Sequence, residues 1–500
     1  MASGSKGFAT RWGLVFALIG ASVGTGNIWR FPRMVALNGG GAFIVAWTIF
    51  LVLVSIPCII AEMILGRSTR HGCPGAFKDF AGEKYTWMGA FLSLNSIGIC
   101  AYYTAVMGWS LRYVFLAIQG FSGVDTAQLF DSVASGSVYT VGAFIVSLLA
   151  TALVISQKIS KGVEKACKFM IPALFLMLAI VAARALTLPG SIEGVKFLFD
   201  LKPEYFFSAN TWLNALTQSA WSVGPGWGLV ITYGVYVKGK SDVALNEFMQ
   251  GFGDNSAALL AGFAVLPAVF ALAPSIQAAE EICASGNTGL TFINLCALFP
   301  QMPLGHFVGV LFFIALFFAA FSSNLVIMLT GVLPLMDAGW SRAKATWTIF
   351  TVCLIWGIPS AWNVSFLNNQ DWVFGMTLLI GGVFTCYAII KYGAKKAREK
   401  YINIPENELY IGPWWDICIK YVTPITILLM FVWWTWQSIQ WYPDSWWNPL
   451  LESSTGTFVV QGGIYALILW IFNKKMADSI KNRYIDTVTE GYPEIPEEYA

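Results

Sequence analysis

The chain has 500 residues, of which 57% are hydrophobic and 12% are charged, far below the roughly 25% charged residues of a soluble domain. Its 30 Lys and Arg nearly balance 28 Asp and Glu, which leaves a net charge of +2. This composition argues against a soluble enzyme, a nucleic-acid-binding protein and a disordered scaffold. It predicts a membrane protein, and bulk charge points to no anionic partner.

Twelve apolar runs follow one another along the chain, each of a length that suits a helix crossing a bilayer, which takes about 20 residues. They lack the alternation of apolar and polar residues found in barrel strands. The predicted fold is therefore an all-α membrane protein with twelve transmembrane helices. The runs lie at about 11–37, 41–69, 86–120, 137–157, 165–187, 211–238, 242–273, 304–336, 341–360, 371–394, 415–438 and 456–474.

Lys and Arg are distributed unevenly between the two sides that these runs define. Of the 30, 24 lie on one side. The other six are Arg30, Arg33, Arg112, Arg184, Lys196 and Lys202. Basic residues gather on the cytoplasmic side of membrane proteins, so both termini are predicted to be cytoplasmic. The predicted location is the plasma membrane, or the inner membrane if the source is bacterial.

Two short segments, one in the first run and one in the sixth, are nearly identical. Residues 22–26 read Ser-Val-Gly-Thr-Gly and residues 222–226 read Ser-Val-Gly-Pro-Gly. Paired glycines and a proline oppose a continuous helix, and broken backbone is tolerated in a membrane only where it lines a cavity. Helix-packing glycines are the alternative interpretation. The matched positions favour two broken spans in an inverted repeat of five plus five helices, about 11–187 and 211–394, as in secondary transporters.

The longest specific motif begins in the first run. It comprises Arg11-Trp12-Gly13, Gly20 through Pro32 and Asn38 through Phe43, with further landmarks at Glu62 through Arg67, Tyr102-Tyr103, Gln218 through Gly228, Asn255-Ser256 and Ala319 through Ser323. This pattern resembles the neurotransmitter:sodium symporters. The resemblance implies a cytoplasmic segment at 1–10, a ten-helix transport core at 11–400, peripheral helices 11 and 12 at 401–476 and a cytoplasmic tail at 477–500.

The resemblance also implies two sodium ions and assigns their ligands. Sodium is a hard cation that prefers oxygen, and carbonyls freed by a broken helix supply oxygens. None of the assigned ligands is a carboxylate, so the carboxylate of a substrate would complete the charge balance of the first site. The first site would comprise Ser22, Asn27, Ser222 and Asn255, and the second Gly20, Val23, Ala319, Ser322 and Ser323.

Gly24 stands where, by the same resemblance, amine transporters carry an aspartate and amino acid transporters a glycine. The implied function is sodium-coupled symport of a small amino acid or related zwitterion by alternating access. Two pocket tryptophans leave a methylated ammonium or betaine-like solute open as an alternative, through cation–π contact. The expected partners are this solute and the lipid bilayer, with no nucleic acid. The implied substrate residues are Ser22, Gly24, Thr25, Gly26, Ile99, Tyr103, Trp221, Ser222, Gly224, Trp227 and Ile327.

Several charged residues resemble the gates of the family. The implied gates are Arg30 with Asp371 on the outside and Tyr236 with Asp337 on the inside. The usual N-terminal arginine of the inner gate is absent, and Lys6 is only a nearby substitute. Glu62, deep in the second span, matches a family carboxylate, and both a buried structural role and a transport role remain open.

The anion site of chloride-dependent members is incomplete in this sequence. The residues that fit it are Gln218, Ser222 and Asn255. Trp47 and Leu259 stand where polar ligands are expected, and an anion beside an apolar residue carries an uncompensated desolvation cost. Little chloride dependence is therefore predicted. Asp254 is a candidate for a substitute negative charge.

Three other classes of function fit the sequence less well. Residues 234–241 satisfy the G-x-x-x-x-G-K-S expression, but they end a helical span instead of joining a strand to a helix, so ATP-driven pumping is rejected. An ion channel is disfavoured because broken spans imply a central site and not a pore lined by charge rings. An intramembrane enzyme is disfavoured because the sequence has no HExxH, Ser-His or paired-carboxylate set at a common depth in the membrane.

Overall fold

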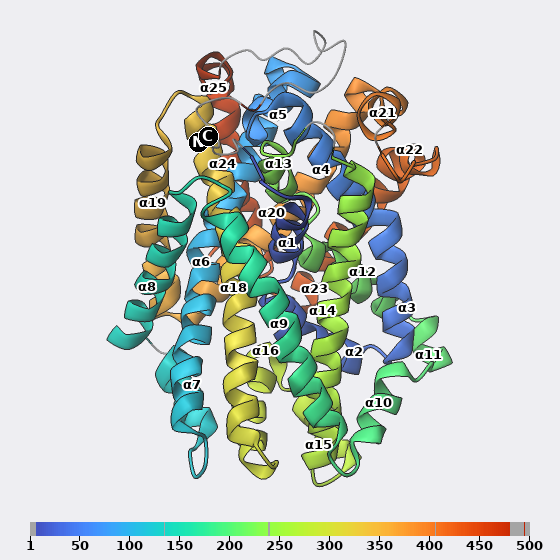
Figure 1. Cartoon of the computed structure of the whole chain (residues 1–500), viewed down its shortest axis with the longest axis vertical. Coiled ribbons are helices and arrows are strands. Elements are labelled where there is room, and N and C mark those ends of the chain that lie inside the picture. Colours follow the sequence, from blue (N-terminus) through green and yellow to red (C-terminus); the bar gives the residue numbers. More distant parts are fainter. Residues whose placement is uncertain (1–6, 135, 239–240, 406, 481–494, 496–500) are drawn as a thin grey trace.

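The chain forms a bundle of helices whose axes run mostly along the length of the molecule in the computed structural model (Figure 1). We call its two ends the α25 end, at the top of Figure 1, and the α15 end, at the bottom. Lys6, residues 239–240 of the phosphate-loop match and most of the predicted tail at 477–500 lie outside the described residues. The described residues are 7–134, 136–238, 241–405, 407–480 and 495.

Nine helical segments within these ranges are long and apolar enough to cross a membrane, and two bent helix pairs raise the number to eleven. Of the twelve predicted crossings, the one at 211–238 is not among these eleven. It is divided into two helices, each too short to cross a membrane alone. The nine are Gly41–Thr69 (with α3, Gly41–Phe50, and α4, Ile56–Thr69), Glu83–Gln119 (with α6, Thr86–Gln119), α8 (Val138–Ile155), α9 (Val163–Leu186), α14 (Val243–Leu272), α18 (Gly305–Asp337), α19 (Arg342–Trp362), α20 (Val364–Tyr392) and Trp414–Trp441 (with α22, Trp414–Ile417, and α23, Thr423–Trp441).

Short helices fill the connections between the crossings. Toward the α15 end they are α7 (Thr126–Ala134), α10 (Ser191–Phe199), α11 (Pro203–Phe206), α15 (Ile276–Ala284), α16 (Gly286–Thr288) and α17 (Leu295–Leu298). Toward the α25 end they are α5 (Cys73–Ala81), α21 (Ala394–Ala397) and α25 (Asn473–Ser479). The all-α prediction is confirmed.

The first crossing is broken where its glycines predicted. α1 (Arg11–Ser22) ends before Val23, whose backbone is extended with φ −69° and ψ 96°. The chain resumes in a π-helical turn at Gly26–Arg30 and continues as α2 (Phe31–Leu37), and the two halves are bent by 53°.

The sixth crossing is broken at the matching place. α12 (Ala209–Val223) and α13 (Leu229–Gly234) are separated by a stretch in which Gly224, Gly226 and Gly228 have φ values of 79°, 88° and 75°. A residue with a side chain would be strained in this left-handed region, which is why the sequence carries glycine at each turn. The prediction of two broken spans is confirmed.

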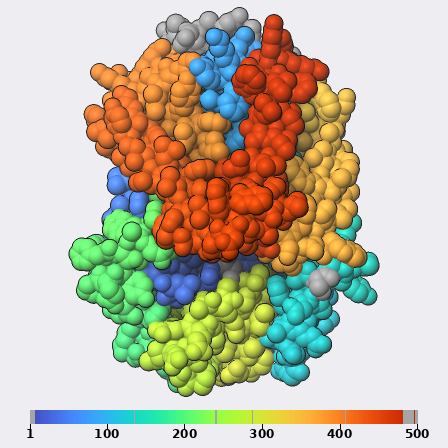
Figure 2. Space-filling view, turned by 180° about the vertical axis from the view of Figure 1, so that it is seen from behind, coloured from blue at the N-terminus to red at the C-terminus, as the bar shows by residue number. Residues whose placement is uncertain are grey.

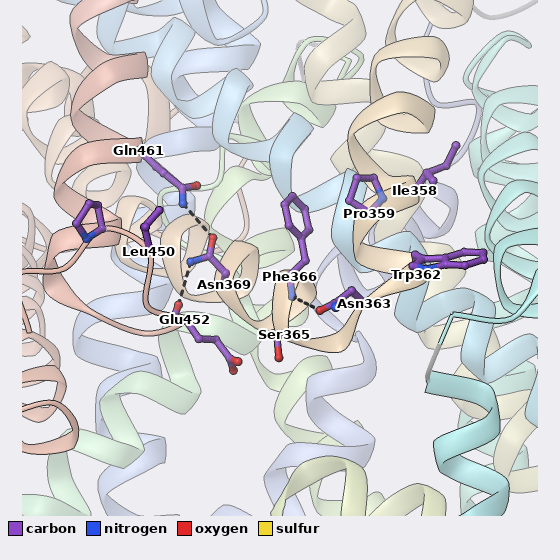
Figure 3. Close-up of a pocket in the computed structure, with 11 residues that line it drawn as sticks. Ile358, Pro359, Trp362, Asn363, Ser365, Phe366, Asn369, Leu450, Glu452 and Gln461 are labelled. Atoms are coloured by element: carbon purple, nitrogen blue, oxygen red, sulfur yellow. Dashed lines mark hydrogen bonds between the residues drawn. The ribbon is translucent and has the colours of Figure 1, made fainter. Parts of the chain in front are cut away.

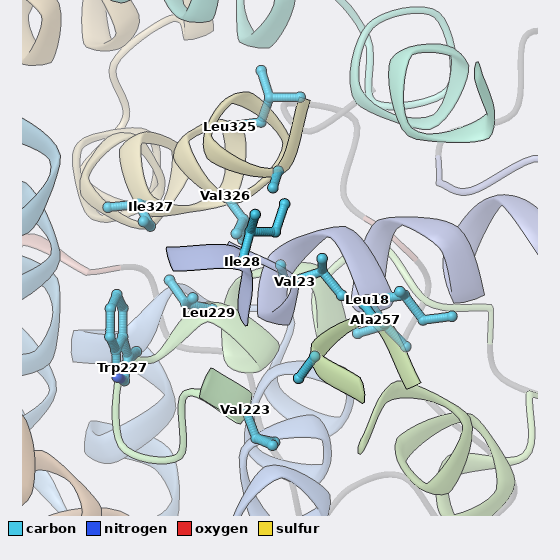
Figure 4. Packing of buried hydrophobic residues seen from close by; sticks show 14 of the residues in the cluster. Leu18, Val23, Ile28, Val223, Trp227, Leu229, Ala257, Leu325, Val326 and Ile327 are labelled. Carbon is cyan, nitrogen blue, oxygen red and sulfur yellow. The ribbon is translucent and has the colours of Figure 1, made fainter. Parts of the chain in front are cut away.

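Apolar side chains hold both breaks in the interior of the bundle. Residues of the first and sixth crossings pack against α14 and α18, and all of them are buried (Figure 4). The ten labelled are Leu18, Val23, Ile28, Val223, Trp227, Leu229, Ala257, Leu325, Val326 and Ile327. Continuous helices therefore surround the backbone that the breaks leave without helical hydrogen bonds, as a membrane requires.

The last two crossings lie at the edge of the bundle. α23 packs against α20, and α24 (Thr455–Ile471) packs against α20 and α6. Figure 2 shows the C-terminal segments, in orange and red, covering the upper and middle part of one face. Apolar side chains of α24 such as Ile464 and Leu467 are exposed, as expected for residues that face lipid. The division into a transport core and peripheral helices stays a prediction.

Candidate ion and substrate site

Buried polar side chains from three crossings meet beside the two breaks. The amide nitrogen of Asn27 donates to the Ser222 hydroxyl at 2.9 Å and to the Asp254 carboxylate at 2.8 Å. The Ser222 hydroxyl donates to the same carboxylate at 2.7 Å. The amide oxygen of Asn27 accepts the backbone N–H of Gly24 at 2.9 Å. We call Asn27, Ser222 and Asp254 the Asp254 cluster, and it joins the first, sixth and seventh crossings.

Ser22 extends this polar region along the first crossing. Its hydroxyl donates to the Val223 carbonyl at 3.1 Å and accepts the side-chain amide of Gln250 at 2.6 Å. Gln250 was not among the predicted site residues. It lies four residues before Asp254, which is one turn away on the same helix face, and that spacing is the signal that identifies it.

The structure does not bring the predicted ligand Asn255 into the Asp254 cluster. Its amide oxygen is buried and has no hydrogen-bond partner among the described residues. Asp254 and Asn255 are adjacent on α14, and successive residues of a helix point about 100° apart, so the two side chains face in different directions. Asn255 as a sodium ligand stays a prediction.

The five residues predicted for the second sodium site lie together between α1 and α18. The Ser323 hydroxyl lies within hydrogen-bond distance of the carbonyls of Gly20 at 3.1 Å, Val23 at 3.1 Å and Ala319 at 3.2 Å, and its single proton can be donated to one of them at a time. The Ser322 hydroxyl donates to the Ala319 carbonyl at 3.1 Å. These carbonyl and hydroxyl oxygens form the uncharged oxygen set that suits a hard monovalent cation.

A cavity of about 710 Å³ lies next to both groups. It is bounded by the two broken crossings, α6, α18 and α20. Ile99 is buried and does not line it, so its role in substrate binding stays a prediction. The predicted substrate residues that line it are Ser22, Gly24, Thr25, Gly26, Tyr103, Trp221, Ser222, Gly224, Trp227 and Ile327.

A tyrosine and two tryptophans shape the wall of this cavity. The Tyr103 hydroxyl accepts the backbone N–H of Thr25 at 3.0 Å. The indole rings of Trp221 and Trp227 pack edge to face with centroids 6.0 Å apart. The Trp227 carbonyl accepts the Ser96 hydroxyl at 2.8 Å, which fixes the backbone that carries this indole.

Glu62 of α4 binds the backbone of the broken sixth crossing. Its carboxylate accepts the N–H of Gly226 at 2.7 Å, of Gly228 at 3.3 Å and of Val230 at 3.1 Å. These donors belong to the break and to the first turn of α13, where no helical acceptor is available. Of the two roles left open for Glu62, the contacts favour the structural one, with backbone groups as partners.

Both predicted outer-gate residues line the cavity. Arg30 lies in the first crossing and Asp371 in α20. Among the described residues, no ion pair within 4.0 Å joins them. From the breaks the cavity continues to Asn210, at the start of α12, and Val364, at the start of α20.

The predicted inner-gate residues are buried near the α25 end. Asp337 accepts the backbone N–H of Gly72 at 2.8 Å, and the Tyr236 hydroxyl accepts a guanidinium N–H of Arg342 at 2.7 Å. The Arg342 guanidinium also lies 5.6 Å from the Tyr236 ring centroid. The sequence places Arg342 only among the basic residues of one side of the membrane. In the structure it contacts Tyr236 of the inner gate, a position for which the sequence offered Lys6 as a nearby substitute.

A second hollow lies between α19, α20 and the segment before α24 (Figure 3). Asn369 bridges its wall, donating to the Glu452 carbonyl at 3.1 Å and accepting the Gln461 amide at 3.0 Å. None of the residues predicted for sodium, substrate or gates lines this hollow. Glu452 lines both this hollow and the cavity, so the two adjoin there.

A helical membrane bundle with two broken crossings beside an oxygen-rich cavity defines a secondary transporter. A profile of the sodium:neurotransmitter symporter family matches residues 6–124 and 127–475. The chain belongs to this family. It is a sodium-dependent, multi-pass membrane transporter and not an enzyme, and the channel alternative is set aside.

Individual relatives agree with this assignment. An uncharacterized sodium-dependent transporter of Methanocaldococcus jannaschii is 30% identical over 84% of this chain and 89% of its own length. The uncharacterized sodium-dependent transporter YhdH of Bacillus subtilis is 29% identical over 85% of this chain and 96% of its own length. The crystal structure of MhsT in complex with L-phenylalanine is 28% identical, has a TM-score of 0.75, and covers 85% of this chain and 99% of that chain.

Proposed function

We propose that this chain is a sodium-coupled symporter that takes up a small amino acid or a related zwitterion by alternating access. The observation that carries the proposal is the crowding around Gly24. A side chain there would meet the Tyr103 hydroxyl at 3.0 Å and the Ser323 hydroxyl at 3.2 Å. An aspartate at this position, as amine transporters carry, would require these two hydroxyls to move, so the cavity as it stands suits a substrate that brings its own carboxylate.

The substrate carboxylate is proposed to lie against the backbone of Thr25 and Gly26. These residues begin the second half of the first crossing, where N–H groups without helical acceptors and the helix dipole favour an anion. The Tyr103 hydroxyl already contacts the Thr25 N–H and supplies a further donor. The L-phenylalanine bound to MhsT supports an amino acid as the class of substrate.

Two sodium ions are proposed as the coupling ions. The second would bind the carbonyls of Gly20, Val23 and Ala319 and the hydroxyls of Ser322 and Ser323, which lie together in the structure. The first would bind near Ser22, Asn27 and Ser222. Because ion and solute would share the broken first crossing, binding of either favours binding of the other.

The orientation is proposed from the charge distribution. The α25 end carries most Lys and Arg and is assigned to the cytoplasm, with both termini on that side. The cavity then extends from the breaks toward the outside, and the contacts of Tyr236 and Asp337 close the inside. Arg30 and Asp371 would approach each other when the substrate is enclosed.

A thermal-shift screen of the purified protein tests the substrate class. Small amino acids and betaines are added in sodium chloride or in potassium chloride, and the melting temperature is recorded. We expect at least one small amino acid to raise the melting temperature in sodium and not in potassium. Stabilisation by the same amino acids without sodium, or by betaines alone, would contradict the proposal.

The replacement Trp227→Leu is expected to change which solutes are accepted. Trp227 and Trp221 fill one side of the cavity with two indoles, so removing one should admit amino acids with longer side chains. If the indoles instead bind a methylated ammonium, the same change should weaken betaine-like solutes by about 0.5 to 2 kcal/mol. Competition against a labelled substrate measures both the acceptance of longer amino acids and the affinity for betaine-like solutes. An unchanged preference in folded protein would show that Trp227 does not shape the site.

Uptake is expected to depend little on chloride. Trp47 is buried at the position of an expected polar ligand. The Asp254 carboxylate already places a negative charge beside Ser222. Replacing chloride by gluconate at constant sodium should leave the initial rate of uptake within about twofold, since an added anion would also be repelled by Asp254. Loss of uptake in gluconate would refute this expectation.

A further inference from the structure

Lysines from three segments gather around a further hollow, which has a volume of about 670 Å³. It is bounded by the end of α20, by α21 and by the π-helical turns Arg398–Ile402 and Cys418–Val422. Both α21 and α22, which flank these turns, lie at the α25 end (Figure 1). We call it the lysine hollow. The charged residues of its described lining are Lys395, Lys396, Glu399, Lys400 and Lys420.

A buried ion pair holds the backbone that carries these lysines. The Arg398 guanidinium contacts both carboxylate oxygens of Asp416, at 3.0 Å and 3.2 Å, and so joins the first turn to α22. Trp415 of α22 is buried, and its indole N–H donates to the Pro57 carbonyl of α4 at 3.0 Å. The charge of Arg398 is therefore balanced inside the protein, and the lysines extend from a backbone with fixed neighbours.

The protein supplies little negative charge to the lysine hollow. Lys395 and Glu399 lie 3.8 Å apart, but their side chains are 72% and 56% exposed, so this ion pair is weak. Lys420 forms no ion pair within 4.0 Å with any residue that the structure describes. Four lysines against one glutamate leave the lining with an excess of three positive charges.

Other lysines of the α25 end have partners of their own. Lys78 donates to the carbonyls of Ala477 and Ile480 at 2.7 Å and 3.1 Å, and Lys168 pairs with Glu164 at 2.7 Å. A general excess of Lys and Arg on one side is enough to orient a membrane protein, and it does not require that lysines of separate segments share one hollow. Their convergence therefore indicates a site for an anion.

Apolar side chains that suit lipid continue from this site along the next crossing. Lys420 belongs to Trp414–Trp441, which is the least buried of the nine long apolar segments found in the described chain. Ile390, which lines the hollow itself, is partly exposed as well. An anion that carries acyl chains would have an apolar surface for them beside the lysines. The exposed side chains near the start of this crossing include Ile417, Tyr421, Ile425 and Leu428.

We propose that the lysine hollow binds the phosphate headgroup of an anionic phospholipid, whose acyl chains lie along the crossing Trp414–Trp441. Lysine ammonium groups bind phosphate oxygens as point charges, and basic hollows at the cytoplasmic ends of membrane helices suit anionic headgroups. The assignment of the α25 end to the cytoplasm places the hollow at the leaflet that carries such lipids. The inference does not depend on which solute or ion the protein transports.

The test counts bound lipid by native mass spectrometry. The full chain is reconstituted in vesicles of phosphatidylcholine and phosphatidylglycerol and then extracted in mild detergent. We expect the wild type to retain phosphatidylglycerol in preference to phosphatidylcholine. Replacing all four lysines of the hollow by glutamine should lower the retained fraction about tenfold or more, whereas replacing them by arginine should preserve it, because arginine keeps the charge.

A matched control removes the same charge elsewhere at the α25 end. Its four lysines are exposed and do not line the hollow, so their replacement by glutamine should lower retention less than about twofold. Glu399→Gln should act in the opposite direction and raise retention about twofold or more, because it removes the negative charge from the lining. A fold defect would not produce such a gain. The control lysines are Lys158, Lys161, Lys474 and Lys475.

Four results would overturn the inference. Equal losses in the two glutamine variants would show that only the overall surface charge attracts lipid. Equal retention of the two lipids by the wild type would show no headgroup site. Unchanged or lower retention in Glu399→Gln would separate the hollow from the bound lipid, even if the four-lysine variant does not fold. Inorganic phosphate that raises the melting temperature in lipid-free detergent as much as phosphatidylglycerol does would identify a soluble anion, and not a lipid, as the occupant.

Discussion

Replacing Glu62 by alanine is expected to destabilise the protein and abolish uptake. The substitution leaves the buried N–H groups of Gly226, Gly228 and Val230 without their acceptor. Each buried donor without a partner costs about 1–3 kcal/mol, so a total loss of about 3 kcal/mol or more is expected. The broken sixth crossing, which carries Ser222 and Trp227, should lose its defined shape. Thermal unfolding and proteoliposome uptake measure the two effects.

Glu247 offers a matched control for Glu62. It is another fully buried carboxyl group, but both of its oxygens lack hydrogen-bond partners among the described residues. Glu247→Gln should therefore change the melting temperature and the uptake little, or raise the stability. Equal losses in Glu62→Ala and Glu247→Gln would show that the backbone contacts of Glu62 are not the reason for its effect.

The Ser323→Ala replacement is expected to reduce sodium-driven uptake by about tenfold or more, because one hydroxyl contacts three carbonyls of the proposed second sodium site. Sodium affinity should fall even when no substrate is present. Ser322→Ala should have a smaller effect, since the Ser322 hydroxyl contacts only the Ala319 carbonyl on its own helix. Sodium titration of uptake and of melting temperature separates the two variants. An unchanged sodium dependence in Ser323→Ala would remove this site assignment.

The breaks could be predicted from the sequence because their cause is local. Gly224 and Gly226 adopt positive φ values that other residues avoid, and Pro225 lacks an N–H. The apolar runs likewise predicted the crossings, because a bilayer demands about 20 apolar residues for each. That the five residues proposed for the second sodium ion lie together could be predicted because they occur in two short, specific motifs.

Contacts between distant segments could not be predicted in the same way. Motif spacing does not decide whether Asp254 or Asn255 faces the breaks. The side chains of neighbouring helical residues point about 100° apart, so an alignment error of one residue selects the wrong one. The contact between Arg342 and Tyr236 joins two segments 106 residues apart, and no local pattern encodes it. Ile99 matched the resemblance in position, yet it is buried and lies outside the lining of the cavity.

Uptake into proteoliposomes under an imposed sodium gradient tests the central claim most directly. Vesicles containing the purified protein are loaded with potassium and diluted into sodium or potassium buffer with a labelled small amino acid chosen by the thermal-shift screen. The account predicts transient accumulation above the outside concentration in sodium only, without ATP, and collapse of this accumulation when an ionophore dissipates the sodium gradient. Accumulation that is equal in potassium, or that requires ATP, would contradict it.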